Sequence, residues 1–145
     1  MKDKIISAKG LVKSFGSGNT KQTIINNLDL DIYANDFTII MGSSGAGKST
    51  LMYSLSGMDM PTSGSIEFSG EDITKMNADK LAVFRRKNCG FVFQQIYMLD
   101  KMSLLDNTLT AGLLINKNKK VVIKRAKELK EITQVRQMKL QLVVR

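Results

Sequence analysis

The sequence predicts a compact α/β fold, and three observations support this prediction. The 145 residues are 43% hydrophobic and include no tryptophan, a composition typical of a globular domain of this length. Residues 37–41, FTIIM, form a short continuous apolar run of the kind that is buried on both faces of a sheet. Residues 119–132 place apolar side chains along one face of a helix.

Two long strands are predicted at the N-terminus. Residues 5–16 predict the first strand, which ends in a turn at the glycine-rich residues 16–19. Residues 22–33 predict the second strand, because leucine and isoleucine alternate with aspartate over residues 28–32. A period of two is typical of an antiparallel strand with one face in water.

The later elements follow from helix caps, breakers and periodicity. In the middle of the chain we expect a helix from Lys48 to Leu55 ended by Gly57 and Pro61, a strand at 64–68, a helix at 77–88 with Asn77 as its N-cap, and a buried strand at 90–94. Beyond these we expect a helix at 103–115 weakened by Gly112, an amphipathic helix at 119–132 with Val122, Ala126 and Leu129 on one face, and strand-like alternation at 138–144.

A glycine- and serine-rich segment follows the apolar run 37–41. Its residues Gly42, Gly47, Lys48 and Ser49 match G-x-x-x-x-G-K-[ST], the P-loop or Walker A pattern. Backbone N–H groups must turn inward around a phosphate chain, so such a loop needs glycine conformations and small side chains. The helix that follows the loop offers free N–H groups and a positive dipole end.

We therefore predict a nucleotide site rather than a flexible turn between strand and helix. Lys48 would supply a positive charge to the β- and γ-phosphates, and Ser49 would offer a hydroxyl to Mg²⁺. The predicted nucleotide-binding residues of the loop are Gly42, Ser43, Ser44, Gly45, Ala46, Gly47, Lys48, Ser49 and Thr50.

The net charge of +9 would suggest a nucleic-acid partner, but its distribution argues against one. Residues 1–116 carry a net charge of +1 and residues 117–145 a net charge of +8. The basic segment lacks interleaved aromatic residues on which bases could stack, so no nucleic acid is expected. A solvated helix end explains the cluster Arg85–Arg86–Lys87 more simply.

Few features of the sequence indicate the cellular compartment of the protein. The single cysteine, Cys89, cannot form an internal disulfide, which suits a reducing cytoplasm. The first residues show no secretion signal, and no apolar run approaches the roughly 20 residues that a membrane span needs.

Several separated motifs resemble, in order, the ATP-binding subunits of ABC transporters. They are GSSGAGKSTLMYSLSGMDMPTSGSIEFSGEDI and, after it, CGFVFQQIYMLDKMSLLDN. The resemblance covers about residues 3–127 and is nearest to the bacterial branch that serves lipoprotein release, macrolide export and bacitracin-type peptide resistance. It implies a P-loop NTPase with a RecA-like core and an N-terminal antiparallel β subdomain, incomplete at the C-terminus.

The resemblance assigns roles outside the phosphate loop. Phe15 takes the position of the aromatic that stacks on adenine, where the residue pattern alone would equally allow a core or turn aromatic. Gln94 takes the Q-loop position, whose glutamine contacts Mg²⁺ and the attacking water in the family; otherwise it would be a polar residue capping the buried strand. The implied catalytic residues are thus Lys48 and Gln94, and the implied Mg²⁺ ligands Ser49 and Gln94. Residues 95–107 would face the transmembrane partner.

Part of the family's machinery is not found in this sequence. The family needs an Asp-Glu pair after a buried strand, but the only adjacent acidic residues, Glu71 and Asp72, precede the Q-loop. The family also uses a histidine near the γ-phosphate, and this sequence contains none. Residues 55–57, Leu-Ser-Gly, look like a fragment of the LSGG signature, but they end the phosphate-loop helix and Met58 follows.

The resemblance fades near residue 129. We expect the N-terminal part of an ABC-type ATP-binding domain over residues 1–129 and a divergent basic tail over residues 130–145, as in a deleted and frameshifted gene product. An intact minimal domain is the alternative.

Missing strands should affect stability. We expect apolar edges to be exposed around residues 37–41 and 90–93, with the alternating residues 138–144 covering one of them. This predicts a marginally stable chain.

The resemblance implies an ATP-binding subunit that couples Mg-ATP binding and hydrolysis to transport. Its partners would be a transmembrane permease and a second ATP-binding subunit, and its place the cytoplasmic face of the cell membrane. The alternatives are a non-hydrolysing nucleotide-binding module and a truncated remnant that lacks the signature and Walker B motifs. A nucleotide kinase is less consistent, because no lid-like arginine set is present.

Overall fold

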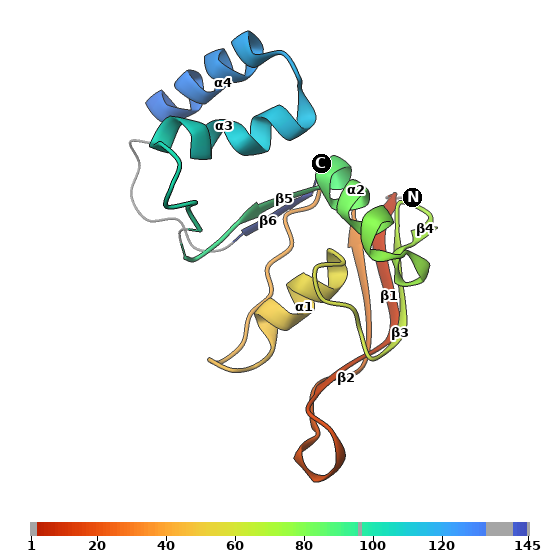
Figure 1. The fold of residues 1–145 in the computed structure, drawn as a ribbon. Coiled ribbons are helices and arrows are strands. Elements are labelled where there is room, and N and C mark those ends of the chain that lie inside the picture. The colour runs from red at the N-terminus through yellow and green to blue at the C-terminus, as the bar shows by residue number, and fades with distance from the viewer. Residues whose placement is uncertain (1–2, 96, 133–140, 145) are drawn as a thin grey trace. The chain divides into compact units, whose positions relative to one another are not determined.

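The computed structural model describes residues 3–95, 97–132 and 141–144. The chain divides into two compact units, Met1–Arg85 and Arg86–Arg145 (Figure 1). The first unit contains β1 (Lys4–Phe15), η1 (Gly18–Thr20), β2 (Gln22–Tyr33), α1 (Lys48–Leu55), β3 (Ser63–Phe68), β4 (Glu71–Asp72) and η2 (Ile73–Lys75), followed by α2 (Ala78–Asn88), which runs past the boundary.

An antiparallel sheet in the order β2-β1-β3-β4 forms the framework of the first unit. Ala8 of β1 pairs with Leu30 on one side and with Ile66 on the other. The predicted strands at 5–16, 22–33 and 64–68 are all confirmed, and the predicted helix at 48–55 coincides with α1. The alternation over residues 28–32 correctly indicated β2, because Leu28 and Leu30 are half-buried and Asp29 between them is exposed.

The core of the first unit lies on one face of this sheet. Ile6, Ala8 and Leu11 of β1 are completely buried, as is Ile66 of β3. Phe68 packs edge-on against Phe84 of α2, with the ring centroids 4.9 Å apart. Such aromatic pairs contribute beyond their buried area, so this contact helps to hold α2 against the sheet.

Local capping places the polar turns of this unit. Asn77 Oδ1 accepts a hydrogen bond from Lys80 N at 3.0 Å, which confirms Asn77 as the N-cap of α2. Asp72 caps η2 in the same way, accepting from Thr74 N. Hydrogen bonds from Thr74, and then from Lys75, hold the pKa of the Asp72 carboxyl below its usual value.

The predicted buried strand at 37–41 is wrong. These residues form no strand, and Phe37, Ile39 and Met41 are 79%, 65% and 85% exposed. A strand buried on both faces needs parallel neighbours to satisfy its backbone, and the described residues supply none beside this run. The expected exposure of an apolar edge at 37–41 is therefore confirmed.

The second unit contains β5 (Cys89–Val92), α3 (Leu104–Ile115), α4 (Lys119–Ile132) and β6 (Gln141–Val144). β5 and β6 pair antiparallel, with Phe91 opposite Leu142. The expectation that the alternating tail covers a strand edge is thus confirmed for residues 141–144, whereas residues 138–140 lie outside the described residues. The prediction that the strand at 90–94 is fully buried was wrong, because Phe91 and Val92 are half-buried and Gly90 and Gln94 are exposed.

Helices α3 and α4 pack on each other as a hairpin. Leu109 of α3 and Val122 of α4 are buried, and Ala126 is half-buried, which confirms the apolar face predicted for α4 at these positions. The side chain of Leu129 lies outside the described residues. A Cβ added at Gly112 would lie 2.5 Å from Val122 Cγ1. Gly112, which the sequence suggested would weaken α3, therefore allows the close approach of α4.

Gly112→Ala is expected to destabilise the chain by about 1–3 kcal/mol, although alanine is the better helix former. The added methyl group would force apart the α3–α4 contact at Val122. Urea denaturation of this variant and of the double variant Gly112→Ala/Val122→Ala measures the effect. The double variant should lose less stability than the summed losses of Gly112→Ala and Val122→Ala, because the added methyl group then meets a smaller side chain. A Gly112→Ala variant more stable than the wild-type chain would contradict the packing.

Candidate functional site

The phosphate loop connects the exposed run 37–41 to α1. Gly45 and Gly47 both have φ of +80°, a left-handed conformation that other residues adopt only with strain. Gly47 is the N-cap of α1, and its carbonyl oxygen accepts the first helical hydrogen bond from Leu51 N at 2.9 Å. Since no side chain caps this end, the first backbone N–H groups of α1 are available to an anion.

The loop lies close against β2. A Cβ added at Gly47 would approach Ile24 Cγ2 to 2.6 Å, so steric contact as well as backbone conformation requires glycine here. Beside the contact is a cavity of about 290 Å³, which involves strand β2, the run 37–41 and the start of α1; its lining residues are Ile24, Ile25, Asn26, Leu28, Ile40, Met41, Ala46, Gly47, Lys48 and Leu51.

Lys48 folds back over the loop. Its Nζ donates to Gly42 O at 2.9 Å and to Ser43 O at 2.6 Å. The ammonium group therefore lies on the inside of the turn that the glycine pattern creates, at the positive end of α1. These two hydrogen bonds keep the ammonium beside the backbone of the phosphate loop.

The remaining residues of the loop are accessible. Gly42 to Ala46 and Ser49 are exposed, while Gly47, Lys48 and Thr50 are half-buried. The structure thus brings together all the loop residues predicted from the sequence. Their roles toward a ligand remain predictions.

Phe15 lies at the end of β1 and is 46% exposed. Lys13, two residues earlier on the same strand, places its Nζ 4.9 Å from the centroid of the Phe15 ring. This distance is within the range of a cation–π contact. Phe15 is therefore not a core aromatic, and its ring has surface available for stacking.

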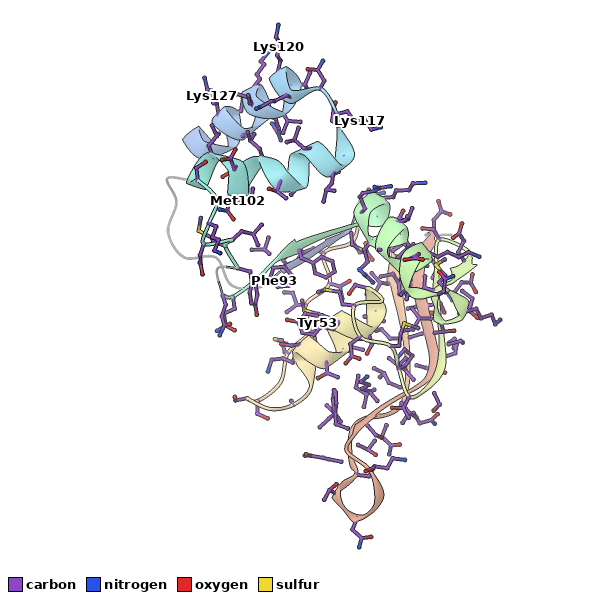
Figure 2. All side chains as sticks on the ribbon, in the orientation of Figure 1. Tyr53, Phe93, Met102, Lys117, Lys120 and Lys127 are labelled. Carbon is purple, nitrogen blue, oxygen red and sulfur yellow. The ribbon has the colours of Figure 1, made fainter. Side chains whose placement is uncertain are left out.

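Gln94 belongs to the second unit and lies two residues after the end of β5. It is exposed at a bend, next to an aromatic cluster in which Phe91 stacks on Phe93 and Phe93 meets Tyr97 edge-on. Figure 2 labels Phe93, the central ring of this cluster.

The side-chain amide of Asn107 holds the backbone of the segment after Gln94. Asn107 Oδ1 accepts from Leu99 N at 2.7 Å, and Asn107 Nδ2 donates to the carbonyl oxygens of Leu99, Met102 and Ser103. Several apolar side chains of this segment are exposed, namely Tyr97, Met98, Leu99 and Met102. The predicted partner-facing residues 95–107 thus include an ordered loop with apolar side chains on its surface.

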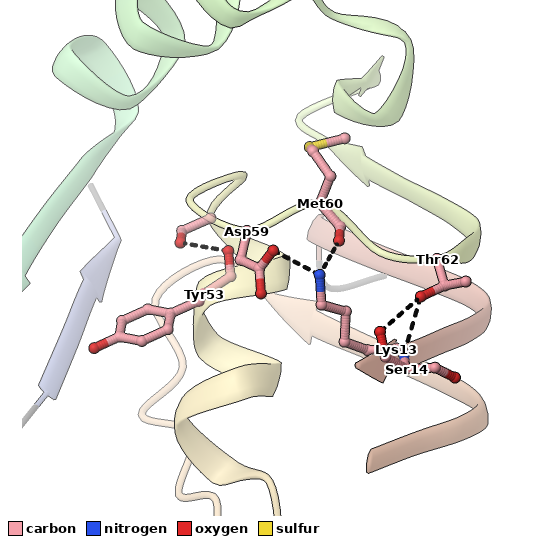
Figure 3. A network of polar contacts seen from close by, with 7 residues as sticks. Lys13, Ser14, Tyr53, Asp59, Met60 and Thr62 are labelled. Atoms are coloured by element: carbon pink, nitrogen blue, oxygen red, sulfur yellow. Dashed lines mark hydrogen bonds and ion pairs between the residues drawn. The ribbon is translucent and has the colours of Figure 1, made fainter. Parts of the chain in front are cut away.

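Sequence reasoning missed the network around Lys13. The Lys13 ammonium is buried, and it donates to Asp59 Oδ1 at 2.6 Å and to Met60 O at 2.7 Å (Figure 3). One signal was present, because Lys13 follows Leu11 on the buried face of β1. The partners on residues 59–60 are far away in the sequence and carry no local pattern.

Arg85 also differs from the prediction. Arg86 and Lys87 are exposed, as expected of a solvated helix end. Arg85 instead is half-buried and donates from Nη1 to Gly57 O at 2.6 Å, so it ties α2 to the turn that follows α1.

Comparison with known proteins decides the family. The model of the ABC transporter family matches residues 25–142, which include the phosphate loop, Gln94 and helices α3 and α4. The chain belongs to the ABC transporter family. Its P-loop NTPase fold with an N-terminal antiparallel β subdomain, predicted from the motifs, is thereby confirmed.

Relatives of this ABC family member include ATP-binding proteins from archaea and bacteria. An uncharacterized ABC transporter ATP-binding protein of Methanocaldococcus jannaschii is 38% identical over 88% of this chain and 57% of its own length. The lipoprotein-releasing system ATP-binding protein LolD of Wigglesworthia glossinidia brevipalpis is 38% identical over 77% of this chain and 49% of its own. The macrolide export ATP-binding/permease protein MacB of Nitrosomonas europaea is 43% identical over 71% of this chain and 16% of its own.

A solved structure has the same fold. A dimeric ATP-binding cassette in a post-hydrolysis state, bound to ADP and Pi, superposes with a TM-score of 0.83 at 27% identity. The match covers 91% of this chain and 58% of that one. The chain therefore spans about half the length of the ATP-binding proteins that it matches.

Two further observations bear on this family member. Within the described residues, no helix is long and apolar enough to cross a membrane. The same residues contain no cluster of three or more histidine, cysteine, aspartate or glutamate side chains that could hold a metal ion. Mg²⁺ does not require such a cluster, because it is usually held by one or two protein groups together with substrate phosphates and water.

Proposed function

We propose that this chain binds Mg-ATP as the ATP-binding part of an ABC transporter. The observation that carries the proposal is the position of the Lys48 ammonium, held inside the glycine-rich loop by Gly42 O and Ser43 O. The same loop combines a positive charge, two glycines in the left-handed conformation and a helix N-terminus without a side-chain cap, and these features favour a polyphosphate.

Each predicted residue has a role in this proposal. The backbone of Gly42 to Thr50 surrounds the phosphates, Lys48 binds the β- and γ-phosphates, and Phe15 stacks on adenine. The exposed Ser49 hydroxyl, in the first turn of α1, fits a ligand of Mg²⁺, and Gln94 is the second proposed ligand. Bound Mg²⁺ would neutralise phosphate charge.

Partners are proposed from the same family. The relatives include ATP-binding/permease proteins, and the structural neighbour is a dimer. We therefore propose a transmembrane permease and a second ATP-binding subunit as partners, at the cytoplasmic face of the membrane. The exposed loop held by Asn107 would contact the permease, and co-purification lost on changing residues 95–105 would support that assignment.

Hydrolysis by the 145-residue chain is a separate question. Lys48 can stabilise charge on the phosphates, but the sequence contains no histidine and no Asp-Glu pair after a buried strand to position water. This favours a nucleotide-binding module without turnover as the second candidate function. The domain limits 1–129 and 130–145 belong to the same proposal.

We expect the purified 145-residue chain to bind ATP in a Mg²⁺-dependent manner and to release no phosphate above background. Calorimetric titration with ATP, with and without Mg²⁺, measures the first, and a phosphate-release assay measures the second. Ser49→Ala should reduce the gain in affinity that Mg²⁺ gives, whereas Ser44→Ala, also in the exposed loop, should not. Steady hydrolysis abolished by Lys48→Ala would overturn the non-hydrolysing reading, and no ATP binding at all would overturn the proposal.

A further inference from the structure

The buried Lys13 ammonium joins two parts of the first unit. On one side, its Nζ donates to Asp59 Oδ1 at 2.6 Å and to Met60 O at 2.7 Å. On the other side, it lies 4.9 Å from the centroid of the Phe15 ring. Lys13 is only 9% exposed, so these partners, more than water, solvate its ammonium group.

The loop that holds Lys13 is attached to α1. Met58 N and Asp59 N both donate to Tyr53 O, at 2.9 and 3.2 Å, near the C-terminal end of the helix. Helix α1 begins at Lys48, in the phosphate loop. A short series of contacts thus runs from the Phe15 ring through Lys13 and Asp59 to the helix that carries Lys48.

We propose that Lys13 is a positioning residue for nucleotide binding, which holds the Phe15 ring in the orientation that stacks on the base. The inference rests on the proposed function, in which Phe15 stacks on adenine. The cation–π contact restricts the ring, and the ion pair with Asp59 fixes the ammonium relative to α1. Phe15 keeps 46% of its surface exposed, so the ring remains accessible to a base.

The test separates binding of the base from binding of the phosphates. Dissociation constants are measured for ATP and for inorganic tripolyphosphate, which has the phosphate chain and no base. Phe15→Ala should weaken ATP binding about tenfold and leave tripolyphosphate binding unchanged. Lys13→Met and Asp59→Asn should weaken ATP binding about threefold, again without affecting tripolyphosphate.

Two further variants complete the design. Lys4 lies on the same strand as Lys13, remote from Phe15 in sequence, and forms a 2.9 Å ion pair with Asp31 of β2. Lys4→Met removes this ion pair and should change neither dissociation constant. In the double variant Lys13→Met/Phe15→Ala, ATP should bind no more weakly than in Phe15→Ala alone, because the ring through which Lys13 acts is absent.

The outcomes distinguish the inference from the proposed function. If Phe15→Ala selectively weakens ATP binding but Lys13→Met and Asp59→Asn do not, Lys13 has no positioning role and the proposed function stands. If Lys13→Met weakens both ligands equally, its role is structural and the inference is wrong. If Phe15→Ala has no effect, the adenine contact itself fails and the inference fails with it. Should Lys13→Met not fold, Asp59→Asn carries the comparison.

Discussion

Replacing Lys48 with alanine is expected to weaken ATP binding by about ten- to a hundredfold. The substitution removes a charge that the structure places inside the phosphate loop, against Gly42 O and Ser43 O. Hydrogen bonds to charged groups contribute about 1.5–3 kcal/mol, and about 1.4 kcal/mol corresponds to a factor of ten. The loss should be equally large for inorganic tripolyphosphate, because Lys48 acts on the phosphates and not on the base.

A matched control is available in the same unit. Lys75 is an exposed lysine paired with Asp72, away from the loop, and Lys75→Ala should leave the ATP dissociation constant unchanged. Titration calorimetry on the three proteins provides the comparison. If Lys75→Ala weakens ATP as much as Lys48→Ala does, the effect is one of general charge and the assigned role of Lys48 is wrong.

Phe68→Ala is expected to destabilise the chain by about 3–5 kcal/mol. Phe68 is 2% exposed and packs edge-on against Phe84, so its removal leaves a cavity between β3 and α2. Typical domains are stable by only about 5–15 kcal/mol, and we expect this chain to be marginal because Phe37, Ile39 and Met41 remain in water. The variant should therefore be largely unfolded at room temperature.

The control for this prediction is the same substitution at an exposed position. Phe37 is 79% exposed, and Phe37→Ala should change the free energy of unfolding by less than about 0.5 kcal/mol. Urea denaturation followed by circular dichroism measures both variants. A sharp unfolding transition at high temperature in the wild-type chain would contradict marginal stability, and equal effects of the two substitutions would contradict the assignment of the core.

Periodicity and local motifs were enough to predict a large part of the fold. The limits of β2 and α1, the N-cap Asn77 and the phosphate loop depend on interactions within a few residues, which a sequence pattern records directly. Segment 37–41 was mispredicted for the opposite reason. Its apolar composition predicts that its side chains are buried, but a strand also needs backbone hydrogen-bond partners from distant parts of the chain.

The candidate site likewise contains residues that the sequence predicted and residues that only the structure revealed. The residues of the loop and the charge of Lys48 follow from the motif, and the resemblance to ABC ATP-binding subunits added Phe15 and Gln94. The network of Lys13 with Asp59 and Met60 could not be predicted, because it joins residues 46 and 47 positions apart. Only the tertiary structure shows that a lysine on the buried face of β1 has partners at all.

The sequence by itself determined the phosphate loop, the limits of β2 and α1 and the family, because these follow from short-range hydrogen bonding, glycine conformations and motif order. The tertiary structure decided that residues 37–41 stay exposed and that residues 141–144 pair with β5. It also decided that Gly112 serves close helix packing and that Lys13 links Phe15 to α1. These features depend on contacts between segments far apart in the chain, and no local sequence pattern records such contacts.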